Sequence, residues 1–179
     1  MESLGLGRNN LRGELEDGLQ VMAVNGYPAR RIYELRQNSD SRIGFTPHSD
    51  YSIITIVLQN FGGLEQFDTE TGTWNQVPEV PGSLLVQVGD YLEVLSNGMY
   101  KSAVHRVVLS SRRVMRVSIA SLHSLGMEEK VEVAEELVDE DHPKRYSESN
   151  FTKFLDFLSS DDGQRGGMSY LDTLKIRGD

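Results

Sequence analysis

The chain has 179 residues, a formal net charge of −9 at pH 7 and no cysteine. This length suits one domain with a sizeable core, and the acidic balance argues against a nucleic-acid partner, whose electrostatic footprint is basic. The lack of cysteine excludes a disulfide framework and a thiolate metal site. No secretory signal and no apolar run long enough to span a membrane is visible, so we expect a cytoplasmic protein without a membrane partner.

The chain opens with a polar, helix-like segment over residues 1–19. Leu11, Leu15 and Leu19 recur every four residues and form one narrow apolar stripe on it. Residues 19–24 then read as a strand. We therefore predict a short N-terminal helix followed by an entry strand.

Short apolar segments with glycine and proline between them occupy the middle of the chain. They cover residues 52–58, 64–68, 83–88, 91–95, 104–110 and 114–122. Asn97-Gly98 is a strong turn signal between two of them. A series of short strands without intervening helices predicts a mainly β fold, either a sandwich or a barrel.

Two side chains with metal-ligating groups lie where the first of these strands begins. His48 and Asp50 are two residues apart, so on an extended chain they point to the same face and can reach one ion. His105 is the only other histidine in a β-like pattern. Two histidines and one carboxylate with open positions form the facial triad of non-haem Fe(II) oxygenases.

An arginine and a serine follow in a later apolar segment, again with same-face spacing. Arg116 and Ser118 place a guanidinium beside a hydroxyl, and the planar guanidinium suits bidentate binding of a carboxylate. Each piece alone is a weak signal. The order H-x-D, then 54 residues, then H, then ten residues, then R-x-S is far more specific.

Further motifs surround these residues in a fixed order. They are Pro47-His48-Ser49-Asp50, Gly62-Gly63-Leu64, Trp74 before Val77-Pro78, Pro81-Gly82, Gly89-Asp90, and Ser96-Asn97-Gly98-Met99-Tyr100-Lys101-Ser102 before His105-Arg106-Val107. With them, the chain from Asn25 to about Ser124 resembles the catalytic core of the plant-type 2-oxoglutarate and iron(II)-dependent dioxygenases. The resemblance implies a double-stranded β-helix, a jelly-roll variant, with flanking helices and the metal at its mouth.

The resemblance also implies roles for single residues. Fe(II) would be held by His48, Asp50 and His105. The co-substrate 2-oxoglutarate would be bound by Arg116, Ser118, Tyr27 and Asn25. Leu122 and Ser124 would face the substrate. Gly26 stands where the family has a tyrosine, which is a departure next to Tyr27.

The implied activity is hydroxylation or desaturation of a small specialised metabolite or hormone, with decarboxylation of 2-oxoglutarate to succinate, O2 as co-substrate and ascorbate as reductant. We expect a monomer whose partner is a small-molecule substrate. One alternative is a truncated, non-catalytic jelly-roll fragment that binds metal only. Another is a zinc hydrolase, since the same ligands can hold Zn with an open position. An ascorbate-driven variant like ACC oxidase is a third.

The predicted domain organisation has three parts. Residues 1–24 form the helix and entry strand, 25–124 the jelly-roll core, and 125–179 a helical and loop extension that packs on the core. Members of the resembled family are about twice as long, and their N-terminal region, which covers one sheet, has no counterpart here. We therefore expect an uncovered sheet face, marginal stability and a poorly closed substrate pocket.

Overall fold

The computed structural model describes residues 2–6, 17–29, 42–109, 114–161, 163 and 169–176. The strands are β1 (Gln20–Tyr27), β2 (Arg42–His48), β3 (Ile54–Gln59), β4 (Leu64–Asp68), β5 (Thr73–Gln76), β6 (Leu85–Val88), β7 (His105–Leu109) and β8 (Arg116–His123). The helices are α2 (Asp90–Leu95), α3 (Phe151–Ser159) and α5 (Tyr170–Leu174), with 3-10 turns η1 (Glu2–Leu4) and η3 (Glu135–Leu137).

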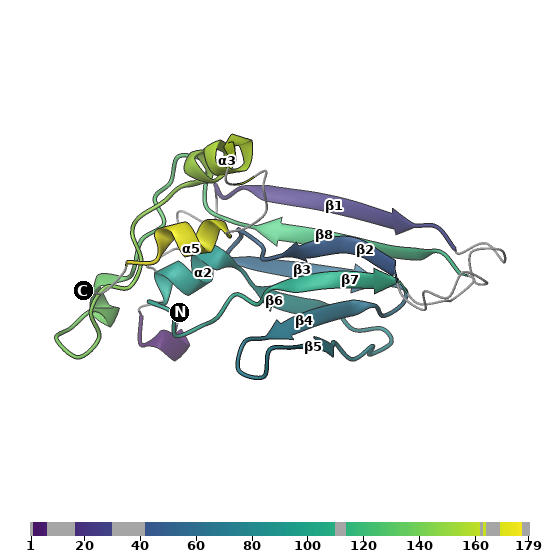
Figure 1. Ribbon diagram of the computed structural model, residues 1–179. Helices are drawn as coiled ribbons and strands as arrows, with labels where there is room; N and C mark the ends of the chain where they lie inside the picture. Colours follow the sequence, from purple (N-terminus) through teal and green to yellow (C-terminus); the bar gives the residue numbers. More distant parts are fainter. Residues whose placement is uncertain are drawn as a thin grey trace.

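The strands form two four-stranded antiparallel sheets, with orders β1-β8-β3-β6 and β2-β7-β4-β5. The chain crosses from one sheet to the other between successive strands, except at the β4–β5 hairpin. The helices gather at one end of the strands (Figure 1). This arrangement is the predicted double-stranded β-helix.

Strand register decides which side chains of the first sheet point between the two sheets. β8 lies between β1 and β3, and Ser118 is opposite Asn25 on one side and Gln59 on the other. Arg116 and Ser118 are both buried. Because side chains alternate along a strand, the even-numbered residues of β8 face the interior.

Two apolar clusters hold the structure together. Leu64, Val107 and Leu109 pack between the sheets. The larger cluster lies at the helical end and contains residues of α2 together with residues that follow Ser124: Tyr91, Val94, Leu95, Leu125, Val131, Val133, Tyr146, Tyr170, Leu171 and Leu174. The residues after β8 are therefore part of the core and secure α2 against the barrel.

The outer face of the β1-β8-β3-β6 sheet is apolar and open. Met22 is 64% exposed, Val24 66% and Val86 60%. Met22 and Val24 alternate with the inward-facing residues of β1, so they share this outer face. Contiguous exposed apolar surface of this kind favours association with other apolar surface.

One predicted strand is wrong. Residues 91–95 form α2 instead, because Tyr91, Val94 and Leu95 recur at helical spacing and all three are buried on one side. Periodicity over so short an apolar run does not separate a helix from a strand. β2 was not predicted, and His48 ends that strand instead of starting the next one.

The predicted N-terminal helix is only partly tested. Leu11 and Leu15 lie outside the described residues, whereas Glu2–Leu4 forms a 3-10 turn. Among the described helices, none combines the length and the apolar character that crossing a membrane requires.

Candidate metal and co-substrate site

The three predicted metal ligands meet at one end of the barrel interior. His48 and His105 are cross-strand partners on β2 and β7, and Asp50 follows β2 by two residues. Asp50 Oδ1 lies 3.7 Å from His48 Nε2 and 3.8 Å from His105 Nε2. One ligand atom from each residue lies within 4.8 Å of the others.

Backbone carbonyls orient both imidazole rings. Nδ1 of His48 lies 2.8 Å from the carbonyl oxygen of Thr46, and Nδ1 of His105 lies 3.1 Å from that of Ala103. A carbonyl only accepts, so each Nδ1 carries the proton and donates it there. Each Nε2 lone pair is thereby left free to bind a metal, on the ring atom that lies 3.7 Å (His48) or 3.8 Å (His105) from Asp50 Oδ1.

The donor set fits a first-row divalent metal. Two ligands bound at about 2.1 Å each lie at most about 4.2 Å apart, and both nitrogen–oxygen distances to Asp50 are shorter than that. Burial, together with the nearby His105, lowers the pKa of His48, which favours the neutral ring that ligates metal. Two imidazoles and one carboxylate with open positions suit non-haem Fe(II).

Arg116 lies inside the same barrel, at the start of β8. It is 6% exposed. Its Nε donates to the carbonyl of Gly62 at 3.1 Å, Nη1 donates to Ser118 Oγ at 3.1 Å and Nη2 donates to Gln59 Oε1 at 2.8 Å. Each terminal nitrogen keeps one further N–H for another acceptor.

Within the described part of the chain, no acidic group neutralises the charge of Arg116. Among the residues that the structure describes, no carboxylate forms an ion pair with it. A buried guanidinium without a counter-charge is costly in free energy, so this position is suited to an anionic ligand. Arg116 and the metal ligands together suit a molecule with an anionic end and a chelating end.

The other predicted co-substrate residues lie next to Arg116 and Ser118. Tyr27 is opposite Arg116 on β1 and Asn25 is opposite Ser118. The guanidinium carbon of Arg116 lies 5.2 Å from the centroid of the Tyr27 ring. The structure thus brings together Arg116, Ser118, Tyr27 and Asn25 on one inner surface.

The two predicted substrate-facing residues have different surroundings. Leu122 is on β8, an even number of residues after Arg116, so both lie on the same face of the strand. It is opposite Val21 and Thr55. Ser124 lies past the strand end and is 2% exposed, and its Oγ has no hydrogen-bond partner among the described residues.

Sequence reasoning missed two polar residues of this region. Gln59 orients Arg116, and a possible signal was the alternation of Thr55, Val57 and Gln59, which places Gln59 on the inner face of β3. Asp90 was noted only as part of a motif. It is 2% exposed and accepts a hydrogen bond from Ser49, and burial raises its pKa to about 7.

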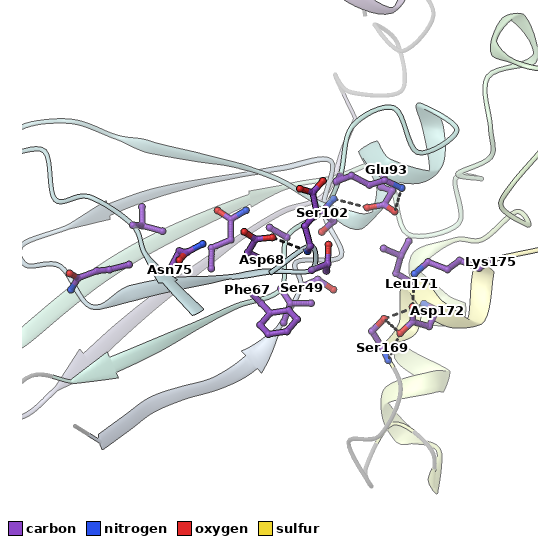
Figure 2. A pocket seen from close by; sticks show the side chains of 18 of the residues that line it. Ser49, Phe67, Asp68, Asn75, Glu93, Ser102, Ser169, Leu171, Asp172 and Lys175 are labelled. Atoms are coloured by element: carbon purple, nitrogen blue, oxygen red, sulfur yellow. Dashed lines mark hydrogen bonds and ion pairs between the residues drawn. The ribbon is translucent and has the colours of Figure 1, made fainter. Parts of the chain in front are cut away.

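A cavity of about 950 Å³ lies between the β4–β5 hairpin and α5, and its lining includes neither the three metal ligands nor Arg116 (Figure 2). Ser49, which separates the first two ligands, lines it, as does Gln66, the cross-strand partner of His105. The residues on its walls come mainly from the β4–β5 hairpin, residues 101–104 and α5. Its lysines are paired with acids of the same lining, Lys101 with Glu93 and Lys175 with Asp172.

Comparison with known sequences agrees with this geometry. A rice protein named 2-oxoglutarate-dependent dioxygenase 21, chloroplastic, is 47% identical over 98% of this chain and 50% of its own length. A second rice protein, named flavanone 3-dioxygenase 3, is 41% identical over 98% of this chain and 52% of its own length. The chain thus spans about half the length of these curated relatives.

Two solved structures of other proteins share this fold. A rice dioxygenase for auxin oxidation superposes with a TM-score of 0.79 and 28% identity, over 98% of this chain and 56% of the other. JOX2 in complex with 2OG, Fe and JA superposes with a TM-score of 0.75 and 29% identity, over 90% of this chain and 46% of the other. The family model of the 2OG-Fe(II) oxygenase superfamily matches residues 18–124, so the chain belongs to that superfamily.

Proposed function

We propose that this chain forms the catalytic part of a 2-oxoglutarate- and Fe(II)-dependent dioxygenase that hydroxylates or desaturates a small specialised metabolite or hormone. The observation that carries the proposal is that two features face the interior from opposite sheets: the buried Arg116, which pairs with no carboxylate among the described residues, and the His48, Asp50 and His105 cluster. A hydrolytic metal site would need no such cation. A 2-oxo dicarboxylate needs both a chelating metal and an anion anchor.

Each residue then has a defined task. His48, Asp50 and His105 would hold Fe(II), with both imidazoles fixed in the ligating tautomer by backbone carbonyls. Arg116 and Ser118 would bind the distal carboxylate. Bound Fe(II) and 2-oxoglutarate would supply dioxygen activation coupled to decarboxylation of the co-substrate to succinate, which oxidises a C–H bond of the substrate.

Tyr27 and Asn25 would complete the co-substrate pocket. Burial raises the pKa of the Tyr27 hydroxyl, although Arg116 opposes this shift, so the phenol stays protonated and able to donate to a carboxylate oxygen. Gln59 orients the guanidinium from the opposite strand. The distal carboxylate of 2-oxoglutarate would thus accept hydrogen bonds from side chains of both β1 and β8.

The names of the relatives support the substrate class without identifying the substrate. They include flavanone 3-dioxygenase 3, hyoscyamine 6-dioxygenase and gibberellin 20 oxidase 1-A, which are named for small metabolites or hormones. We therefore propose a small-molecule substrate, a monomer, and neither a nucleic-acid nor a membrane partner. A cytoplasmic location is also proposed, although one relative is named as chloroplastic.

Turnover of 2-oxoglutarate by the purified chain tests the proposal. With Fe(II), ascorbate and O2, we expect succinate to form and to stop when Fe(II) is chelated. Arg116→Ala is expected to abolish it at low 2-oxoglutarate. The matched control is Arg106→Ala, because Arg106 pairs with Glu65 and lies over the Trp74 ring. Turnover driven by ascorbate without 2-oxoglutarate would indicate the chemistry of ACC oxidase. Metal-dependent hydrolysis without 2-oxoglutarate would contradict the proposal.

A further inference from the structure

The turn that carries two of the metal ligands is held from the side facing away from the metal. Ser49 lies between His48 and Asp50, and its Oγ donates to Asp90 Oδ2 at 3.1 Å. The backbone N–H of Asp90 donates to the carbonyl oxygen of Asp50 at 2.7 Å. Asp90 therefore holds this turn at two successive residues.

The start of α2 packs against the next residues of the same turn. The N–H groups of Gly89 and Tyr91 donate to the carbonyls of Ile53 and Ser52, at 3.0 and 3.2 Å. A Cβ at position 89 would lie 1.9 Å from the carbonyl oxygen of Ser52, so only glycine fits without moving the backbone. The position of Asp90 relative to the turn is thus fixed by its neighbours on both sides.

The same helix holds the segment that leads to the third ligand. Glu93 is 3% exposed, and its Oε2 accepts a hydrogen bond from the backbone N–H of Ser102 at 2.6 Å (Figure 2). Ser102 precedes His105 by three residues. The Tyr146 hydroxyl donates to Glu93 Oε1 at 2.6 Å and fixes that carboxylate in turn. α2 thus joins both ligand-bearing segments, with Asp90 as its contact on the side of the first two ligands.

Burial of an acid at position 90 is costly in free energy. Its Oδ1 has no hydrogen-bond partner among the described residues. A buried carboxylate that is only partly satisfied costs more free energy than an apolar side chain of similar volume. The hydrogen bond from Ser49 needs an acceptor at this position.

We propose that Asp90 is a positioning residue for the metal centre. Through Ser49 and the carbonyl of Asp50, it fixes the direction of the Asp50 carboxylate relative to His48 and His105. The inference rests on the metal site of the proposed function, but not on 2-oxoglutarate or turnover. Groups that orient metal ligands typically contribute about 10–100-fold to metal affinity.

Titration of the full chain with Mn(II), with the free ion followed by electron paramagnetic resonance, tests this role. We expect Ser49→Ala and Asp90→Ala each to raise the Kd for Mn(II) about tenfold. The double variant should bind no more weakly than the weaker single variant, because both changes remove one contact. Asp90→Asn should restore most of the affinity, since its amide oxygen still accepts from Ser49.

A control separates positioning from general stability. Ser83→Ala removes a serine whose hydroxyl donates to the carbonyl of Val80 on the exposed surface, and it should leave the Kd unchanged. Ser49→Ala should melt within a few degrees of the wild-type apo chain. A folded Ser49→Ala chain with wild-type Mn(II) affinity would overturn the inference, as would additive effects of the two changes or a wild-type chain that binds no Mn(II). Loss of 2-oxoglutarate turnover with this affinity pattern intact would count against the proposed function alone.

Discussion

Arg116 Nη2 donates to Gln59 Oε1 at 2.8 Å, from β8 to the neighbouring β3. Together with Ser118, this contact holds both terminal nitrogens of the guanidinium inside the barrel. The orientation of the anion anchor is therefore set by the register between these two strands, before any ligand binds.

Gln59→Leu should weaken 2-oxoglutarate binding and leave the affinity for the metal unchanged. The substitution leaves a buried N–H of Arg116 without its acceptor and frees the guanidinium to rotate. We expect the Kd for 2-oxoglutarate to rise about tenfold, as for loss of a hydrogen bond to a charged group. Calorimetric titration on the Mn(II)-loaded chain measures this Kd, with Gln20→Leu at the exposed start of β1 as the control. Equal affinities in both variants would show that Gln59 does not orient the anchor.

Metal binding should stabilise the folded chain through Asp50. A ligand at 100 times its Kd adds about 2.7 kcal/mol, which is a rise in Tm of roughly 5–10 °C for a chain of this size. Asp50→Ala should lose this rise while the apo protein melts at or above the wild-type temperature, because a buried carboxylate has been removed. Anaerobic melting with and without Mn(II) gives both values. A rise that persists in Asp50→Ala would place the metal elsewhere.

The open apolar sheet face should make the monomer prone to non-specific aggregation. Val24→Thr with Val86→Thr keeps β-branched side chains and makes this face more polar. We expect less aggregation by light scattering and an unchanged Kd for Mn(II). Unchanged aggregation would mean that this face is not responsible for it.

Stability should fall at alkaline pH through Tyr146. Burial and the hydrogen bond to Glu93 raise the pKa of Tyr146 above its ordinary value of 10.0. The unfolded chain therefore loses this proton first, so the contribution is full below about pH 10 and is lost as pH rises toward the folded pKa. Tyr146→Phe should cost about 1–2 kcal/mol at pH 8 and less at pH 11 by urea unfolding. A difference that stays constant with pH would contradict this assignment.

Much of this candidate site could be predicted from the sequence, because the residue types that bind metal and their two-residue spacing on a strand are both visible in a short stretch of chain. His48, Asp50 and His105 have the right residue types and order, and β4 has the predicted bounds of residues 64–68. α2 could not be separated from a strand, because its apolar run is too short for periodicity to decide.

Gln59 and Asp90 were missed for a different reason. Their roles depend on contacts between elements distant in sequence, with Arg116 in one case and with Ser49 in the other. Residue type and local spacing carry no signal of such contacts. The register between strands and the packing of α2 create these contacts, and both exist only in the folded chain.

The most direct test of the account is an optical spectrum of the anaerobic chain with Fe(II), before and after 2-oxoglutarate is added. We predict a visible metal-to-ligand charge-transfer band for the wild type and for Arg106→Ala at the same 2-oxoglutarate concentration. Arg116→Ala should need a far higher concentration for the same band. A folded, Fe(II)-loaded wild-type chain that gives no band, or an Arg116→Ala chain that titrates like the wild type, would contradict the joint assignment of the metal centre and the anion anchor.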